Sequence, residues 1–208
     1  MNEGTRELEL KYKLPDRDAY EKLRAALGRP QEEFEQVNYY FQSPDGSIPG
    51  DRGVIRIRAE KGRLIFTVKL GSMVEEGLTD AREFEEPWKG THESLPPAPE
   101  DFWQSGYRGM RELERSFGRR CPLEWAGSMT NFRSVYSTAD GLRLEVDASR
   151  YPDGSQDFEV ELETGNPGRD RIRLLTLLTQ LGVSCSTQTA TKYQRFLAHR
   201  QPAKPRPV

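Results

Sequence analysis

The feature that most constrains the fold is a period-two alternation of charged and apolar residues in six separate segments. Side chains alternate between the two faces of a β-strand, so each segment predicts a strand with one apolar and one charged face. ELELKYK at 7–13, for example, places two leucines and a tyrosine on one face, and two glutamates and two lysines on the other. The other five segments are 53–59 (GVIRIRA), 63–70 (RLIFTVKL), 81–86 (AREFEE), 141–148 (GLRLEVDA) and 157–164 (DFEVELET).

The spacing of these segments predicts hairpins, because short connections such as Glu60-Lys61-Gly62 separate neighbouring strands. An antiparallel α+β fold is therefore expected. Strands are predicted at 5–14, 34–41, 53–59, 63–70, 81–86, 130–137, 141–148 and 157–164. Helices are predicted between Asp16 and Gly28, in one or two short pieces within 91–125, and at 169–181 and 187–199. We expect one domain over 1–200, with 91–125 as a helical insertion or a linker between halves, and a disordered tail at 201–208.

The charged faces are unusual because like charges gather on the same strand. A solvated sheet face is the ordinary interpretation of any one such strand. Over six strands that interpretation weakens, because neighbouring like charges destabilise a sheet. A divalent cation and a polyanion would make the same arrangement favourable, since carboxylates bind hard cations and Arg and Lys bind phosphate oxygens. If the sheet closes into a barrel, the charged faces would line its interior and the apolar faces would pack against helices outside.

The overall charge excludes some classes of function. Lys and Arg number 31 against 33 Asp and Glu, a net charge of −2, which argues against a general nucleic-acid-binding protein. The sequence contains no run of 18 apolar residues, so no membrane span is predicted. The segment MNEGTRELEL lacks the apolar core of a secretory signal, so a cytoplasmic protein is expected. Cys121 and Cys185 are expected to be free thiols. With two histidines and no Cys/His cluster, any metal would bind carboxylates, which favours Mg²⁺ or Mn²⁺.

An ordered series of short motifs resembles the CYTH superfamily, also called triphosphate tunnel metalloenzymes. ELELK at 7–11 matches the family's ExExK signature, which is weak alone. It is followed in the family's order by NYYF, RIR, FTVK, REFE, NFR, LEVD, FEVELE and TKY, from about residue 3 to residue 197. The segment 91–125, rich in proline and aromatic residues, departs from the pattern. Its tryptophans, Trp103 and Trp125, and the preceding Trp88 are expected to pack structurally rather than to stack on a ligand.

The resemblance implies an eight-stranded antiparallel barrel whose charged interior binds a triphosphate together with Mg²⁺ or Mn²⁺. It implies metal ligands at Glu7, Glu9, Glu159 and Glu161, where the choice of Glu159 and Glu161 over Glu163 is left open. It implies substrate-binding residues at Lys11, Arg56, Arg58, Lys69, Arg133 and Lys192. Lys11, Glu83, Glu85 and Asp147 would be catalytic, the three carboxylates orienting a base, a water or a second metal ion.

The leading hypothesis is a metal-dependent triphosphatase acting on inorganic triphosphate or a related organic triphosphate. A class IV type of adenylate cyclase is the first alternative, because the same cations and carboxylates would serve it. A non-catalytic polyphosphate or nucleotide binder is the second, and a barrel without a ligand is the third. The expected partner is a triphosphate-containing small molecule, with no nucleic acid and no membrane, and a homodimer is left open.

Overall fold

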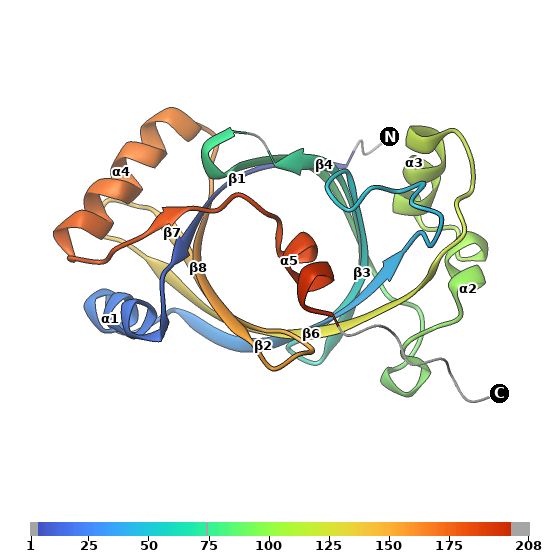
Figure 1. Cartoon of the computed structure of the whole chain (residues 1–208), viewed down its shortest axis with the longest axis horizontal. Coiled ribbons are helices and arrows are strands. Elements are labelled where there is room, and N and C mark those ends of the chain that lie inside the picture. The colour runs from blue at the N-terminus through green and yellow to red at the C-terminus, as the bar shows by residue number, and fades with distance from the viewer. Residues whose placement is uncertain (1–3, 74, 201–208) are drawn as a thin grey trace.

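The alternating segments form the wall of a closed antiparallel barrel. The computed structural model describes residues 4–73 and 75–200. Eight strands follow one another around the barrel in the order β5-β4-β3-β2-β6-β7-β8-β1, and β1 pairs with β5 to close it (Figure 1). Closure gives both edges of the sheet a hydrogen-bonding partner. The strands are β1 (Thr5–Leu14), β2 (Glu32–Gln42), β3 (Gly53–Glu60), β4 (Arg63–Met73), β5 (Leu78–Pro87), β6 (Glu124–Ser137), β7 (Arg143–Arg150) and β8 (Gln156–Glu163).

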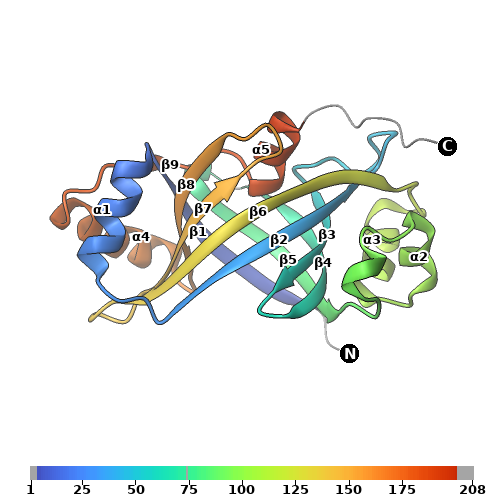
Figure 2. The same cartoon turned by 90° about the horizontal axis from the view of Figure 1, so that it is seen from below.

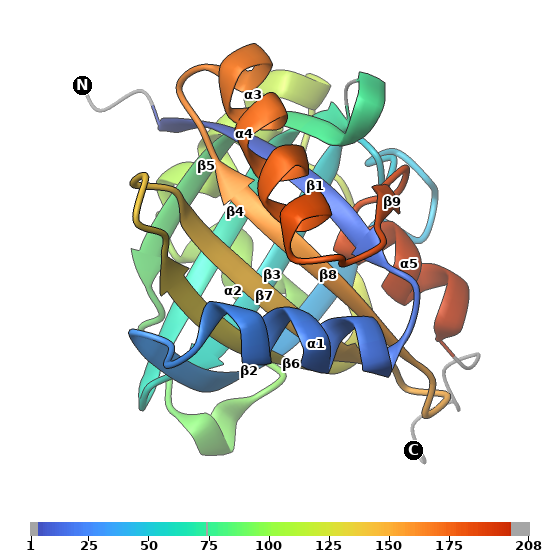
Figure 3. The same ribbon diagram turned by 90° about the vertical axis from the view of Figure 1, so that its left-hand side faces the viewer.

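Helices cover two opposite sides of the barrel and one of its ends. They are α1 (Arg17–Leu27), α2 (Pro99–Gln104), α3 (Arg108–Phe117), α4 (Pro167–Gln180) and α5 (Lys192–His199), with single 3₁₀ turns at Glu75–Gly77 and His92–Ser94. Figures 2 and 3 show α1 and α4 on one side and α2 and α3 on the other. Helix α5 lies across one end of the barrel (Figures 1 and 2). No helix in the described part of the chain has the length and apolar content needed to cross a membrane.

The first helix shows how local sequence sets these bounds. The Asp16 side chain accepts a hydrogen bond of 2.8 Å from the backbone N–H of Ala19, which satisfies a free donor of the first turn. Gly28 ends the helix at φ 78°, a conformation that favours glycine. The bounds predicted from Asp16 and Gly28 are therefore confirmed.

The apolar faces of the strands point outward and form the hydrophobic core beneath the helices. Under α1 and α4, fully buried residues such as Leu10 and Val160 belong to one cluster. Under α2 and α3, Ile57 and Phe66 pack with Phe102 in a second cluster. Apolar burial is the main favourable term in folding, and here it takes place between the outer face of the barrel and the helices. The interior of the barrel can therefore be lined by polar groups.

Register within the sheet places opposite charges side by side inside the barrel. Lys11 of β1 lies opposite Glu161 of β8, and Arg133 of β6 lies opposite Asp147 of β7. Cross-strand neighbours of opposite charge stabilise a sheet, so register alone offsets part of the repulsion expected within each strand. The predicted α+β barrel with a charged interior and helices outside is confirmed.

The predicted last helix, 187–199, is wrong at its start. Residues Ser186–Thr187 form a short strand, β9, that pairs with β1, and the helix begins only at Lys192. Thr191 caps it: its hydroxyl accepts from the N–H of Gln194, whose side chain in turn accepts from the N–H of Thr191. The segment 91–125 contains α2 and α3, and these pack outside the barrel. The predicted disordered tail at 201–208 lies outside the described residues.

Candidate active site inside the barrel

The barrel encloses a cavity of about 490 Å³ whose lining is mostly polar. Tyr193 and the cap residue Thr191 line its α5 end. The charged side chains that line it are Glu7, Glu9, Lys11, Asp51, Arg56, Arg58, Lys69, Glu83, Glu85, Arg133, Arg143, Glu145, Glu161, Glu163 and Lys192. The structure thus brings all of the predicted site residues to this lining except Asp147 and Glu159. A concave site of this size with convergent charged groups suits a small, highly charged ligand.

Three of the predicted phosphate-binding residues, Arg56, Arg58 and Lys69, lie together on β3 and β4. We call these three residues the open wall. Arg56 has its nearest carboxylate, Glu83, at 3.5 Å, and its buried Nε atom has no hydrogen-bond partner in the described structure. Lys69 lies 2.5 Å from Glu7 and 3.2 Å from Glu83. A buried guanidinium with an unused donor can still bind a ligand oxygen.

Arg58, the third member of the open wall, pairs with two carboxylates, Glu85 and Glu60. Its Nη2 donates to Glu85 at 2.8 Å, and its Nε lies 3.0 Å from Glu60. Like Arg56, it has a buried Nε without an aligned hydrogen bond in the described structure. The open wall therefore keeps donor capacity on both arginines.

The other three basic residues lie in the locked wall, which we define as Lys11, Arg133 and Lys192 with the carboxylates of β7 and β8. Arg133 donates to both oxygens of Asp147 at 2.9 and 2.6 Å and to Glu161 at 2.6 Å, and also contacts Glu145. Lys11 lies 2.5 Å from both Glu9 and Glu161. Every cation here already contacts two or more carboxylates.

Helix α5 supplies Lys192 to the locked wall. The ammonium group donates to Asp147 at 2.5 Å and lies 3.0 Å from Glu159 and 3.6 Å from Glu161. Burial alone would lower the pKa of Lys192, but these carboxylates raise it well above its ordinary value. The pKa of Glu161 lies well below its ordinary value: burial would raise it, but Lys11, Lys192 and Arg133 lower it. Lys192 and Glu161 are therefore both charged near neutral pH.

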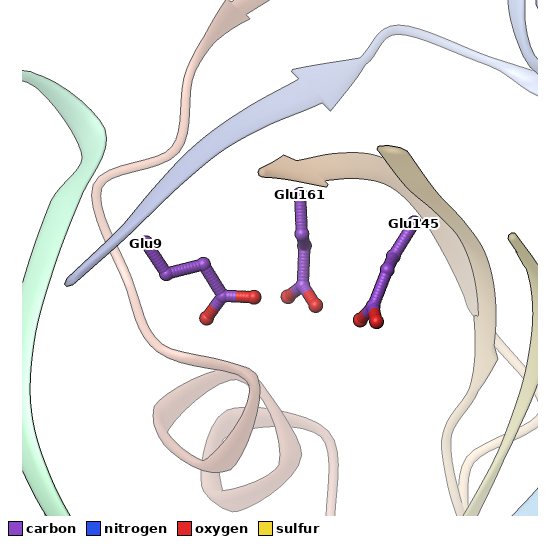
Figure 4. Close-up of side chains that lie close together, drawn as sticks. All are labelled: Glu9, Glu145 and Glu161. Carbon is purple, nitrogen blue, oxygen red and sulfur yellow. The ribbon is translucent and has the colours of Figure 1, made fainter. Parts of the chain in front are cut away.

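Glu9, Glu145 and Glu161 form a carboxylate group facing the cavity, each offering an oxygen within 4.8 Å of the others (Figure 4). Register explains the group, because Glu161 lies opposite Glu145 on β7 while Glu9 lies on the adjoining β1. Burial and the negative charge of Glu161 raise the pKa of Glu9 to about 8. Carboxylate oxygens are the ligands that Mg²⁺ and Mn²⁺ prefer. A divalent cation would relieve the repulsion that raises this pKa, so these residues fit such an ion.

The predicted metal ligands are divided between three places. Glu9 and Glu161 meet in the cavity-facing group, whose third member, Glu145, was not among the predicted metal ligands. Glu7 also lines the cavity but pairs with Lys69 of the open wall. Glu159 is fully buried outside the lining, in a second carboxylate group with Asp147 and Glu161. The alternation in 141–148 places Glu145 on the charged face of its strand, but only the register shows that Glu145 lies opposite Glu161.

The predicted catalytic carboxylates also differ in their access to the cavity. Glu83 and Glu85 line it, and Glu85 accepts hydrogen bonds from Arg58 and from the hydroxyl of Thr67 at 3.2 Å. Asp147 is fully buried and is held by Arg133 and Lys192. Asp147 therefore contacts two of the predicted phosphate-binding residues, whereas Glu83 and Glu85 face the cavity directly.

Neutral polar groups that the sequence analysis did not select complete the lining. Gln36 and Asn38 of β2 face the cavity between the two walls, and the buried Oδ1 of Asn38 has no partner in the described structure. The predicted structural role of the tryptophans is consistent with Trp88, Trp103 and Trp125, which pack in the cluster beneath α2 and α3.

The sequence matches the family model of the CYTH domain over residues 5–193. Among solved structures, it is similar to a candidate adenylyl cyclase from Hippeastrum with a dominant triphosphatase activity. That match has a TM-score of 0.82 at 24% identity and covers 94% of this chain and 97% of that one. A candidate adenylate cyclase from Bacillus halodurans matches with a TM-score of 0.69 at 21% identity, over 92% and 98% of the two chains. A candidate adenylate cyclase from Vibrio parahaemolyticus matches with a TM-score of 0.54 at 16% identity, over 94% of this chain and 99% of that one.

Proposed function

The chain belongs to the CYTH family, and on that premise we propose that it is a divalent-metal-dependent triphosphatase that hydrolyses inorganic triphosphate inside the barrel. The observation that carries the proposal is the pairing of the open wall with the carboxylate group of Glu9, Glu145 and Glu161 across one cavity. One side offers unused cationic donors for phosphate oxygens. The other offers the hard oxygen ligands of a divalent cation.

Binding of the triphosphate would fall mainly to Arg56, Arg58 and Lys69. Arginine can donate two parallel hydrogen bonds to phosphate oxygens, and lysine supplies a compact charge. Lys11, Arg133 and Lys192 would add positive charge from the locked wall. Because they are held by carboxylates, they would contribute a fixed charge rather than a mobile contact.

A metal ion would be held by Glu9, Glu145 and Glu161, with Glu7 and Glu159 as the alternatives that the family resemblance supplies. When bound, Mg²⁺ or Mn²⁺ would neutralise charge on the phosphate oxygens and so favour attack at phosphorus. The described lining of the cavity contains no Cys, His or Ser, and its two threonine hydroxyls already bond the backbone, Thr79 at the Glu9 carbonyl and Thr191 at the N–H of Gln194. Water is therefore the proposed nucleophile, and Glu83 and Glu85 are the cavity-facing carboxylates that could accept its proton.

Phosphoryl transfer requires positioning and charge stabilisation more than covalent catalysis. The ion pairs of this cavity supply such a preorganised field, since their charges are fixed before the ligand enters. The dominant triphosphatase activity of the Hippeastrum protein supports hydrolysis as the first reaction to test. Inorganic triphosphate is the preferred substrate because the identified groups recognise phosphate and none has been assigned to a nucleoside.

The test is to incubate purified protein with inorganic triphosphate, ATP or thiamine triphosphate, with Mg²⁺ or Mn²⁺, and to resolve all products. We expect orthophosphate from inorganic triphosphate, and its loss in Glu9→Gln and in EDTA. Cyclic AMP with pyrophosphate from ATP would instead establish the cyclase alternative. Binding without any product would leave the polyphosphate binder.

A further inference from the structure

Helix α5 carries basic side chains along the face that contacts the β7–β8 hairpin. Lys192, Arg195 and His199 are spaced three and four residues apart, so they lie on one side of the helix. Tyr193 and Phe196 are buried in an apolar cluster instead. This face thus reaches from the cavity, at Lys192, to the hairpin turn, where His199 Nδ1 lies 2.9 Å from Asp153.

Glu159 is the carboxylate that two of these cations share. Its Oε1 atom lies 3.0 Å from Lys192 Nζ and 2.7 Å from Arg195 Nη2. Neither contact is aligned as a hydrogen bond, so the interaction is one of charge. Glu159 is fully buried and does not line the cavity. Its negative charge therefore acts on neighbouring cations, with Lys192 and Arg195 at contact distance and Lys11 farther away.

Arg195 is fixed by its other contacts. It lies 2.6 Å from Asp157, donates to the hydroxyl of Tyr151 at 2.9 Å and donates to the carbonyl of Ala190 at 2.7 Å. The Tyr151 hydroxyl in turn donates to Asp157 at 2.5 Å. Arg195 is absent from the cavity lining, so it would act on a bound ligand only through another residue.

We propose that Arg195 is a positioning residue for polyanion binding: it neutralises Glu159, so that this carboxylate neither offsets the positive charge that Lys192 presents to a ligand nor draws the ammonium away from the cavity. This inference rests on the proposed function in requiring a polyanion in the barrel. Arg133 already shares the charges of Asp147 and Glu161. Among the described ion pairs, Glu159 has only Lys192 and Arg195. Without Arg195, the full charge of Glu159 would oppose the attraction between Lys192 and a phosphate.

The same charge balance assigns Glu159 a different role from the metal ligand suggested by the family resemblance. A metal ligand is needed for activity, so its neutral variant is inactive. A carboxylate that only offsets the positive charge of Lys192 weakens polyanion binding, so a protein with the neutral residue there should bind the polyanion more tightly. The two roles therefore predict opposite results for Glu159→Gln.

The experiment measures hydrolysis of inorganic triphosphate with Mg²⁺ by four variants. Arg195→Gln should raise KM roughly tenfold with kcat within about twofold, the scale of one uncompensated charge near the site. Arg195→Lys should recover most of the KM, and Glu159→Gln should lower it. The double variant Arg195→Gln/Glu159→Gln should return to within about threefold of wild type, because both charges are removed together.

His199→Gln is the matched control, because it removes another hairpin contact of α5 on the same face but outside the cavity. It should leave KM unchanged even if it lowers the unfolding midpoint. An unchanged KM in Arg195→Gln, or loss of activity in Glu159→Gln comparable with that in Glu161→Gln, would overturn the inference. An equal rise of KM in His199→Gln would do the same, since it would indicate general loosening of α5.

Calorimetric binding of the imido analogue of triphosphate, with Mg²⁺, separates this inference from the proposed function. If the wild type binds the analogue but forms no product, the triphosphatase proposal fails, while a roughly tenfold weaker affinity in Arg195→Gln still supports the inference. If the wild type hydrolyses triphosphate and Arg195→Gln binds equally well, only the inference fails. A wild type that binds neither compound overturns both.

Discussion

The two walls of the cavity carry the same kinds of side chain in different states. In the locked wall each cation contacts at least two carboxylates, as Arg133 does with Asp147 and Glu161. In the open wall Arg58 and Lys69 each contact two carboxylates as well, but Arg56 has one distant partner, and both arginines keep an Nε without an aligned hydrogen bond. A fully paired cation supplies a fixed field, whereas an incompletely paired one can bind a ligand. Residue type alone therefore does not reveal which of six basic residues receives the phosphates.

The largest expected effect comes from breaking the locked wall at Glu161, the carboxylate that contacts Lys11, Arg133 and Lys192. Glu161→Gln should lower kcat/KM at least roughly 1,000-fold, because it removes a proposed metal ligand. It should also lower the free energy of unfolding by about 3 kcal/mol, because buried cations lose a partner. Denaturant unfolding and steady-state kinetics measure both. Full stability in an inactive variant would contradict the locked wall as described.

The open wall should show the opposite balance of activity and stability. Arg56→Ala should raise KM for inorganic triphosphate roughly 30-fold, because it removes a ligand contact. Its free energy of unfolding should stay within about 0.5 kcal/mol of wild type, since Arg56 has only one weak ion pair. Arg52→Ala, outside the cavity lining, is the control. A large loss of stability in Arg56→Ala with little change of KM would reverse the assignment of the walls.

A third test uses the pKa of Glu9, which burial and the charge of Glu161 raise from 4.5 to about 8. A carboxyl with a raised pKa in the folded state stabilises the fold fully below pH 4.5, and this contribution is lost as pH rises through 8. The metal-free protein should therefore lose stability between about pH 5 and pH 8. In Glu9→Gln the thermal unfolding midpoint should change less over this pH range than in the wild type, by several degrees. Thermal unfolding in EDTA across this range measures it, and a slope that persists in the variant would count against the raised pKa.

Metal binding offers a second test of the raised pKa of Glu9, through the proton that this residue would release. A cation bound by Glu9 requires its ionised form, so binding below pH 8 should release a proton. Calorimetry of Mg²⁺ binding in two buffers of different ionisation enthalpy would detect that proton. Equal apparent enthalpies in both buffers at pH 7 would show that Glu9 is not protonated before the metal binds.

The smallest expected effect lies at the edge of the cavity. Arg143 lines it but is half exposed, and it pairs with Glu145 at 2.5 Å. Arg143→Gln should raise KM by no more than about threefold, and the effect should shrink as salt is added, because exposed charges are screened. KM at low and high ionic strength checks this. A salt-independent effect as large as that of Arg56→Ala would place Arg143 within the open wall.

Much of the fold could be predicted because a period of two is a direct signature of strands. ELELKYK gave its strand with the bounds that the structure has, and the clustering of like charges indicated that charged faces turn inward. The start of the last helix was missed, although Thr191 and Gln194 form the Thr-x-x-Gln pattern of a capping box. That pattern begins at Thr191, five residues before the fully buried helical aromatic Phe196, and would have placed the helix correctly.

The site could be predicted less completely, because register and burial are not visible in a single strand. Parity places Glu159 and Glu161 on one face, yet Glu161 lines the cavity while Glu159 lies behind it. Glu145 joins Glu9 only because Glu161 stands opposite it on the neighbouring strand. Which carboxylates share an ion therefore depends on three strands at once, and the sequence supplies no alignment between them.

The most direct measurement is a crystal structure with Mn²⁺ and the imido analogue of triphosphate, in which anomalous scattering locates the metal. The distinction between the walls predicts Mn²⁺ on Glu9, Glu145 and Glu161, with phosphate oxygens on Arg56 and Arg58 and with the ion pairs of Arg133 intact. Phosphate bound by Arg133 in place of Asp147, with Arg56 making no contact, would contradict it.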